Sequence, residues 1–277
     1  MIRKIIKAAV VFVVVLCLHS EAWSQGNLLV TPVRVVFENS KLKDDLNITN
    51  IGQDSASFLV SFVHYRMMPD GSFQVLEKGD SLTSADKYLR LFPRKVKLGP
   101  NESQTLRLQC RKPAGMKEGE YRTHLFFRAE KDAAPLGLDK KKIDSTQMSV
   151  RITAIFGISI PVIIRNGNLK AENTLSDIQM KAKTDSTSVL SCKINRKGNR
   201  SSYGNIKIDF SPENGQKTEL ASAKGIGVYP EITSRDFSII LHWPAGLKSR
   251  SGKLLVRYTL PDEEGGALLA QTEYVIH

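Results

Sequence analysis

Apolar and polar residues alternate along most of the chain after about residue 28, in short runs rich in β-branched and aromatic side chains. A period of two puts successive side chains on opposite faces of a strand, and the Gly, Pro, Asn and Asp residues between the runs mark turns. The pattern predicts an all-β protein. In the first half, strands are expected at Leu28–Glu38, Asp44–Asn50, Ala56–Met67, Tyr88–Leu98, Gln104–Lys112, Tyr121–Glu130 and from about Met148 to Arg165. This number of strands is typical of an immunoglobulin-like sandwich.

A second series of weaker strands follows the turn Asn166-Gly167-Asn168. These strands are expected at Ser176–Lys183, Val189–Asn195, Asn205–Phe210, Ser238–Trp243, Lys253–Leu260 and Leu268–Ile276. A chain of 277 residues is long enough for two domains, each with its own core. We therefore predict an N-terminal immunoglobulin-like domain over residues 25–165 and a smaller β-sandwich over residues 166–277.

The first residues have the pattern of a secretory signal. Basic residues up to Lys7 precede an apolar run from Ala8 to Leu18, and Ala22-Trp23-Ser24 offers small residues for cleavage. The run is shorter than the roughly 20 residues that cross a bilayer. We predict that residues 1–24 are a cleaved signal peptide; a short membrane anchor that stays attached is the alternative.

The formal net charge is +12, so the protein is basic. Such a surface could attract nucleic acid, anionic lipid or acidic partners, but an exported protein seldom meets nucleic acid, and we expect a solvated surface. After cleavage only Cys110 and Cys192 remain. Both alternate with apolar neighbours, which predicts small buried side chains and no disulfide framework.

Candidate chemistry is sparse. The histidines of the mature chain, His64, His124, His242 and His277, are far apart in sequence and show no metal-ligand spacing. His64 and His124 lie inside strand runs, where sheet residues are a better interpretation than catalysts. We therefore expect no catalytic residue, no metal site and no cofactor, and the protein is not expected to be an enzyme.

One segment stands out from an ordinary sandwich. From Met148 to Ile160 apolar side chains fall at even positions, while Ser149, Arg151 and Thr153 occupy odd ones. If this strand lies at a sheet edge, it exposes unpaired backbone groups and an apolar stripe, which is a binding device or an aggregation hazard. A buried central strand is the alternative.

Three stretches resemble the PapD-like periplasmic chaperones of the chaperone–usher pathway. They are residues 33–39 (VRVVFEN), residues 46–50 (LNITN) and residues 92–107 (FPRKVKLGPNESQTLR). The last is similar to the family pattern P-x-x-x-x-L-x-P-x-x-x-Q-x-x-R. The resemblance is good over residues 28–165 and faint over 166–277.

The resemblance implies two immunoglobulin-like domains set around a cleft. It also implies a periplasmic chaperone that binds pilin-like or other surface-fibre subunits and donates its seventh strand to complete the subunit's sandwich. The donating residues would be Ile152, Ala154 and Phe156, with Val150 and Met148 extending the stripe. An outer-membrane usher and self-association through the edge strand are further partners that it suggests.

In the family, two basic residues clamp the carboxylate at the subunit's C-terminus. Arg34 matches the first, but Pro161 stands where the second, a Lys, is expected. Either Arg34 works alone, or another basic side chain substitutes, or the client is not anchored by its carboxylate. Arg165 matches an Arg of the domain junction, and its expected acidic partner is Asp262 or Glu263.

A second function class remains open on the sequence alone. The chain could be a structural or adhesive exported protein that has the chaperone-like fold without strand donation. Exposure of the stripe from Ile152 to Phe156 separates the two, because a donor needs it accessible or capped by self-association, whereas a structural protein should bury it.

Overall fold

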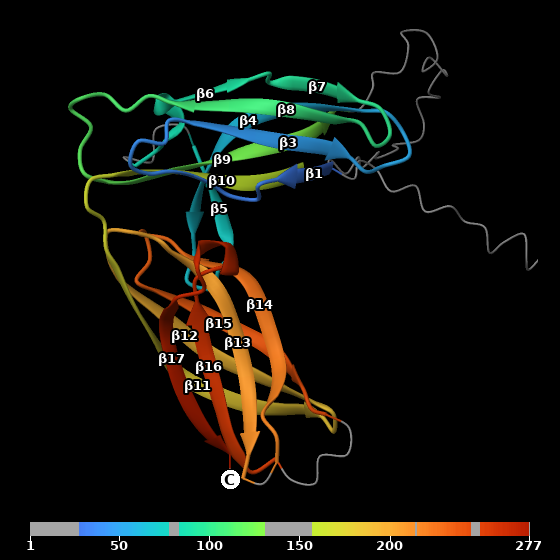
Figure 1. Cartoon of the computed structure of the whole chain (residues 1–277), viewed down its shortest axis with the longest axis vertical. Coiled ribbons are helices and arrows are strands. Elements are labelled where there is room, and N and C mark those ends of the chain that lie inside the picture. Colours follow the sequence, from blue (N-terminus) through green and yellow to red (C-terminus); the bar gives the residue numbers. More distant parts are fainter. Residues whose placement is uncertain (1–27, 78–82, 131–156, 214, 245–249, 277) are drawn as a thin grey trace, which may run out of the picture.

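A computed structural model describes residues 28–77, 83–130, 157–213, 215–244 and 250–276. Figure 1 shows two β-sandwiches, one above the other, with their strands running in different directions. This arrangement confirms the predicted all-β fold with two sandwiches. Within the described ranges, no helix is long and apolar enough to cross a membrane.

The first sandwich packs a four-stranded sheet against a larger one. The four-stranded sheet has the order β1 (Leu28–Thr31), β3 (Lys43–Asn50), β8 (Ser103–Cys110) and β6 (Leu89–Phe92). The larger sheet has the order β2 (Val35–Phe37), β10 (Gly157–Asn166), β9 (Gly119–Glu130), β4 (Ala56–Met67) and β5 (Phe73–Leu76), and β7 (Lys95–Leu98) also pairs with β4. A short 3-10 helix, η1 (Asp86–Tyr88), precedes β6.

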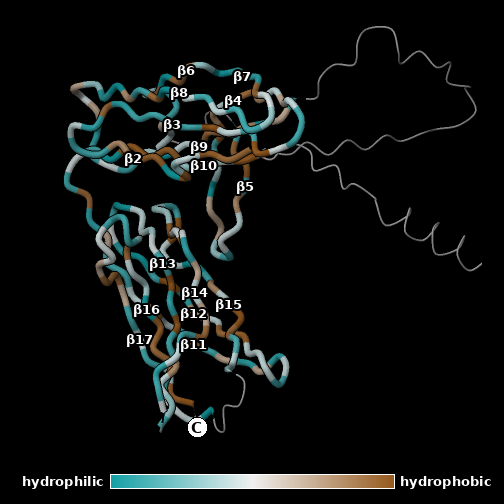
Figure 2. The backbone as a smooth tube through the Cα atoms, turned by 45° about the vertical axis from the view of Figure 1, so that its right-hand side comes forward, coloured by the Kyte–Doolittle hydropathy of each residue, from teal (hydrophilic) through white to brown (hydrophobic). Residues whose placement is uncertain are grey.

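The core of this sandwich follows the period of two. Alternate side chains such as Leu46 and Ile48 on β3, Leu106 on β8, and Val162 and Ile164 on β10 are fully buried. Hydrophobic stretches in Figure 2 accordingly follow β9 and β10. Cys110 is a free, buried thiol in this core, and Cys192 is the same in the second sandwich, as the sequence predicted.

Two strands predicted as continuous are each broken at a proline. Leu28–Glu38 divides into β1 and β2 around Pro32, and Tyr88–Leu98 divides into β6 and β7 around Pro93. In both cases the halves belong to opposite sheets of the sandwich. Proline has no amide hydrogen for a ladder, so the chain leaves one sheet there and joins the other. The prediction was wrong because both halves keep the alternation of apolar residues.

The second sandwich pairs a three-stranded sheet with a four-stranded one. The first has the order β11 (Ala171–Thr184), β12 (Thr187–Gly198) and β15 (Ser234–His242). The second has the order β14 (Thr218–Val228), β13 (Ser202–Pro212), β16 (Gly252–Thr259) and β17 (Leu268–Ile276). A 3-10 turn, η2 (Asp262–Glu264), joins β16 to β17. The sequence missed β5 and β14, whose exposed or small side chains give no clear alternation.

The two sandwiches meet through the hairpin of β4 and β5 and through the segments around Glu120 and Arg34. Figure 1 shows the hairpin extending from the first sandwich toward the second. At its tip the amide of Asp236 donates to the Pro69 carbonyl at 2.7 Å, and the amide of Met67 donates to the Glu231 carboxylate at 2.8 Å. These two hydrogen bonds therefore hold the hairpin of the first domain against the second domain.

Candidate functional site

Strand β10 has an open edge over its first half. Gly157–Pro161 pair with Arg128–His124 of β9 on one side. On the other side β2 pairs, in parallel, with Val162–Ile164. Among the described residues, no strand pairs with the outer side of Gly157–Pro161. That segment therefore presents backbone donors and acceptors on which another strand can build.

Side chains of this half-free strand divide between core and solvent. Gly157, Ile158 and Ser159 are exposed, whereas Ile160 is buried at 3% exposure and begins the core-facing series. That series continues with Val162 and Ile164. These three residues of the sandwich core are even-numbered, in the same parity as the predicted apolar stripe from Met148 to Phe156. Ile163 is buried as well, but on the other face of the strand, with Met67 and Tyr229. One alternating pattern thus runs from the sandwich core toward the segment upstream of the open edge.

The predicted donating residues, Met148, Val150, Ile152, Ala154 and Phe156, lie outside the described residues. Their role remains a prediction from the sequence. The predicted signal peptide, residues 1–24, also lies outside them.

Arg34 is buried where the two domains meet. It lies between β1 and β2, with 7% of its side chain exposed. Its guanidinium carbon is 4.3 Å from the centre of the Tyr203 ring, and Nη1 is 3.5 Å from the Glu264 carboxylate, both in the second domain. The atoms Nε and Nη2 are buried and have no hydrogen-bond partner among the described residues. Burial lowers the pKa of the Arg34 guanidinium from its usual value.

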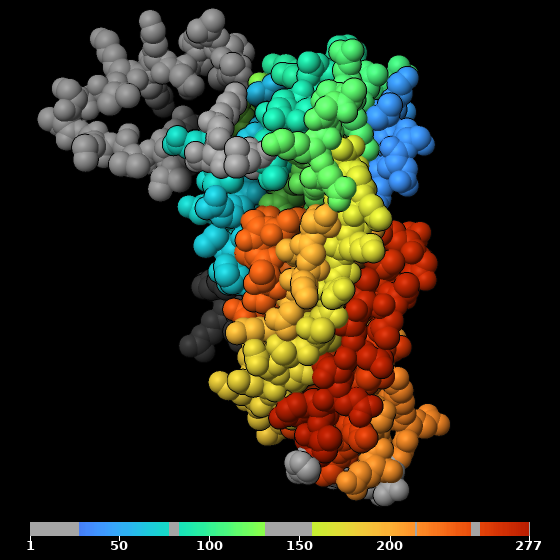
Figure 3. All heavy atoms as spheres, turned by 90° about the vertical axis from the view of Figure 1, so that its left-hand side faces the viewer, coloured from blue at the N-terminus to red at the C-terminus, as the bar shows by residue number. Residues whose placement is uncertain are grey.

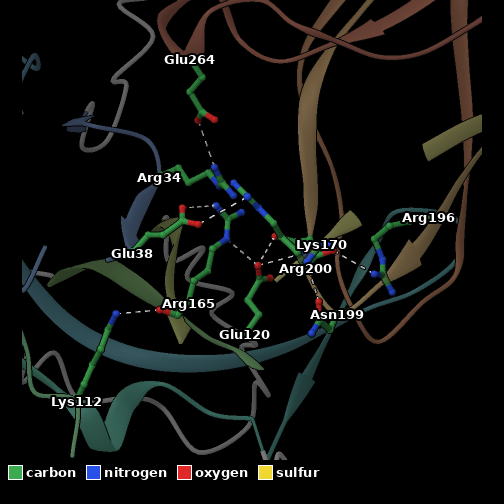
Figure 4. A network of polar contacts seen from close by, with 11 residues as sticks. Arg34, Glu38, Lys112, Glu120, Arg165, Lys170, Arg196, Asn199, Arg200 and Glu264 are labelled. Atoms are coloured by element: carbon green, nitrogen blue, oxygen red, sulfur yellow. Dashed lines mark hydrogen bonds and ion pairs between the residues drawn. The ribbon is translucent and has the colours of Figure 1, made fainter. Parts of the chain in front are cut away.

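Arg165 also lies at the junction, but its acidic partners differ from those predicted. Its Nε atom donates to Glu120 at 3.1 Å, and Nη1 donates to Glu38 at 3.0 Å. Both acids belong to the first domain, whereas Asp262 and Glu263 were expected (Figure 4). The prediction failed because the turn that carries those two acids brings its third acid, Glu264, to Arg34 instead.

Glu120 is the residue that connects Arg165 to the second domain. Its Oε2 atom accepts the Arg165 bond and two bonds from Ser201, from the amide at 3.1 Å and from the hydroxyl at 2.8 Å. Arg200, next to Ser201, is 3.7 Å from Glu38 and adds a second ion pair across the junction. Sequence reasoning missed Glu120, because a single Glu at the start of a strand carries no local signal.

A second interdomain cluster surrounds Arg122 on β9. Its guanidinium lies 3.6 Å from the centre of the Tyr229 ring and forms an ion pair with Glu231, and both partners belong to the second domain. It also donates to the carbonyl of Tyr65 at 2.8 Å. Together with the bond from Met67 to Glu231, these contacts hold the first domain's larger sheet against the second domain.

The buried histidines of the first domain form no catalytic arrangement. On β4, His64 Nδ1 lies 3.0 Å from the Ser84 hydroxyl and its Nε2 lies 3.5 Å from the Asp86 carboxylate, but the hydroxyl donates directly to that carboxylate at 2.7 Å. A nucleophilic serine would donate to the histidine, with the acid on the far side of the ring. On β9, His124 is buried and contacts the rings of Tyr65 and Phe73. In the ranges that the structure describes, no cluster of three or more His, Cys, Asp or Glu could hold a metal.

Neither a family model nor a curated protein sequence matches this chain. Solved structures similar to it include the E. coli chaperone DraB, at 13% identity, with 91% of this chain and 97% of that one covered and a TM-score of 0.42. The CupB2 chaperone of Pseudomonas aeruginosa is 14% identical, with 89% and 98% covered and a TM-score of 0.40. The SafB chaperone of Salmonella enterica, solved in complex with the SafA pilin, is 12% identical, with 92% and 99% covered and a TM-score of 0.41. Each of the three is named as a chaperone.

Proposed function

We propose that this protein is a periplasmic, non-enzymatic chaperone that stabilises pilus- or fimbria-type subunits by donating an edge strand. The observation that carries the proposal is the open edge of β10 at Gly157–Pro161. Upstream of this edge the sequence continues with an alternating apolar stripe. An exposed edge with an apolar stripe in register is what strand addition requires.

The way in which β10 is held favours donation. All ten residues of β10 pair with β9, and Val162–Ile164 are buried and pair with β2. The strand is therefore ordered before a client arrives, which reduces the conformational entropy lost on binding. A client whose sandwich lacks a strand would gain main-chain hydrogen bonds from the edge, and its groove would receive the side chains of the stripe.

Arg34 is the proposed anchor for the client's C-terminal carboxylate. Its charge is buried, and two of its donor atoms have no partner among the described residues. A charge-assisted hydrogen bond to a carboxylate would satisfy them. Because a shift of one residue turns every side chain of a strand to the opposite face, such an anchor would select the register that fits. Pro161 supplies no charge, so in this proposal Arg34 binds the client's carboxylate without the second basic residue of the family pattern.

The donating stripe is tested by a paired substitution. Ile152→Asp together with Phe156→Asp places two charges where the client's groove expects apolar side chains, and desolvating them is costly. We expect the tagged variant to lose the subunits that the wild-type protein recovers from its native periplasm, as measured by mass spectrometry of the co-eluting proteins. The thermal transition should stay near that of the wild type.

A matched control is Leu268→Asp with Val275→Asp, which adds the same charges at half-exposed positions of β17 in the second domain. This control should still capture subunits. Undiminished capture by the Ile152 and Phe156 variant would refute strand donation. A wild-type protein that recovers no β-rich exported subunit, from cells making surface fibres, would favour a structural or adhesive role.

A further inference from the structure

Glu264 reaches from the second domain to Arg34 in the first. Glu264 is the last residue of the η2 turn between β16 and β17. Its Oε1 atom is 3.5 Å from Arg34 Nη1. Figure 4 shows the two side chains pointing toward each other from the two domains. In Figure 3 the red C-terminal part of the second domain rises to the side of the first domain where the blue N-terminal part lies. A carboxylate of the chain itself therefore already stands at the proposed anchor.

The contact leaves Arg34 only partly satisfied. A charge-assisted hydrogen bond from a guanidinium to a carboxylate is usually about 2.7–2.9 Å long. The separation of 3.5 Å is longer, and Nε and Nη2 have no partner among the described residues. The Tyr203 ring lies against the guanidinium, 4.3 Å from its carbon atom to the ring centre. The site thus has donor capacity for a second carboxylate that Glu264 does not use.

Glu264 is placed so that it can leave. Its side chain is 46% exposed, whereas that of Arg34 is 7% exposed. The next residue, Gly265, has φ 92°, and a side chain there would meet nothing within 4 Å, so the turn ends in open space. Water can therefore solvate the Glu264 carboxylate after it leaves Arg34.

We propose that Glu264 is a resident carboxylate that occupies the Arg34 site in the free protein and is displaced by the client's terminal carboxylate. This inference rests on the proposed function, in which Arg34 is the anchor. Arg165 holds two carboxylates, but there the second, Glu38, also pairs with Arg200. Arg34 offers a single positive charge, so a carboxylate that bonds to its Nε and Nη2 atoms replaces Glu264, whose half-exposed side chain moves into water. The exchange keeps the buried charge of Arg34 paired in both states. An anion that binds Arg34 more weakly than Glu264 does cannot displace Glu264.

The inference is tested on the full mature chain with acetate as the probe, so that no client is needed. The ¹⁵N-labelled Arg34 Nε–H resonance, assigned by its loss in Arg34→Lys, is followed during titration with sodium acetate at constant ionic strength. We expect Glu264→Gln to bind acetate roughly two- to fivefold more tightly than the wild type, because a half-exposed competing charge has been removed. Glu263→Gln, which removes the same charge from the neighbouring exposed position, should behave like the wild type.

The outcomes separate the inference from the proposed function. Equal acetate binding in Glu264→Gln and the wild type, or an equal gain in Glu263→Gln, would overturn the role of Glu264. No response of the Arg34 resonance to acetate in any variant would also overturn it. A gain confined to Glu264→Gln supports Glu264 as the resident carboxylate of the Arg34 site. If client capture nevertheless proves independent of Arg34, the proposed anchor fails, and displacement by the client fails with it.

Discussion

Buried charge at the domain junction is the main feature at the scale of single residues. Arg34, Arg165 and Glu120 each have side chains less than one-tenth exposed. Removing such groups from water is costly, and the cost is offset only where partners are supplied. Arg165 and Glu120 pair with each other, although Glu120 Oε1 is buried without a partner among the described residues. Arg34 keeps two such atoms, Nε and Nη2, and both are donors on one guanidinium. One carboxylate could accept from both, which distinguishes Arg34 from the structural ion pair.

Loss of the Arg34 charge should weaken client capture. For Arg34→Ala we expect a loss of about 1.5–3 kcal/mol in binding free energy, the size of a hydrogen bond to a charged group. The measurement is the Kd of the subunit recovered by pull-down, determined by calorimetry. Arg107→Ala, at an exposed position of β8, is the control and should bind as the wild type does. An unchanged Kd for Arg34→Ala would show that the carboxylate is held elsewhere.

His124 should make the fold sensitive to mild acid. Burial, helped by the charges of Arg122 and His64, lowers the pKa of its imidazole to about 3. The unfolded chain takes up the proton near pH 6.5 and the folded chain does not, so stability falls as pH falls between about 6.5 and 3. From pH 7 to pH 5 this residue alone should cost about 2 kcal/mol of the free energy of unfolding.

Urea unfolding at pH 7 and pH 5 checks this expectation by comparison of variants. His124→Phe keeps an aromatic ring beside Tyr65 and Phe73 but cannot titrate, so its loss on acidification should be smaller than that of the wild type by about 2 kcal/mol. His242→Gln, at an exposed position, should keep the wild-type loss. Identical pH dependence in His124→Phe and the wild type would show that His124 takes up its proton in the folded state.

Strand β10 combines two environments at the scale of the element. Val162–Ile164 pair on both sides, whereas Gly157–Pro161 pair on one. In the free protein, amides of Gly157–Ile160 that point away from β9 should exchange with solvent much faster than those of Val162–Ile164, because exchange follows local opening and exposure. Hydrogen-exchange NMR measures both groups. Added client should slow the outer group only, and fast exchange that persists in the complex would show that the client binds elsewhere.

The period of two was sufficient to predict most elements, and proline set its limit. Ala56–Met67 and Leu268–Ile276 were predicted with the bounds that the structure has, because long alternating runs identify a half-buried strand directly. At Pro32 and Pro93 the chain crosses from one sheet to the other, but apolar and polar residues keep alternating. The alternation alone therefore does not show where one strand ends and the next begins. Strand β14 was missed because its Ala, Ser and Gly residues pack through small side chains.

Whole-molecule organisation depends on contacts between residues far apart in the chain. Glu120 meets Ser201, Arg122 meets Glu231, and Arg34 meets Glu264. A motif in the first domain located Arg34 and Arg165, but their partners lie where the resemblance is faint and where no spacing rule applies. The resemblance therefore placed Arg34 and Arg165 between the domains, where the structure has them, and failed on the acids that face them.

Loss of Glu120 should weaken the connection between the domains. Glu120→Ala leaves the buried Arg165 with one acid and the Ser201 amide without its acceptor, which should cost about 3 kcal/mol. The chain has two tryptophans, and Trp23 lies in the predicted signal peptide. Fluorescence of Trp243 reports on the second domain's core, and far-UV circular dichroism reports on both domains. Urea unfolding followed by the two signals should coincide in the wild type and separate in the variant.

Glu118→Ala, two residues earlier and exposed, is the control and should unfold as the wild type does. Coincident transitions at wild-type stability in Glu120→Ala would mean that the hairpin of β4 and β5, with Arg122, is enough to join the domains.

The division of β10 also bears on how a bound subunit would be released. Ile160, Val162 and Ile164 belong to the core of the first domain whether or not the outer edge of β10 is covered, so release of a client would expose none of that core. Release then needs only a competing strand that fits the subunit's groove better, and the reaction is an exchange between two similar partners. Such an exchange can run on differences in binding free energy alone, and it returns the donor intact for the next round.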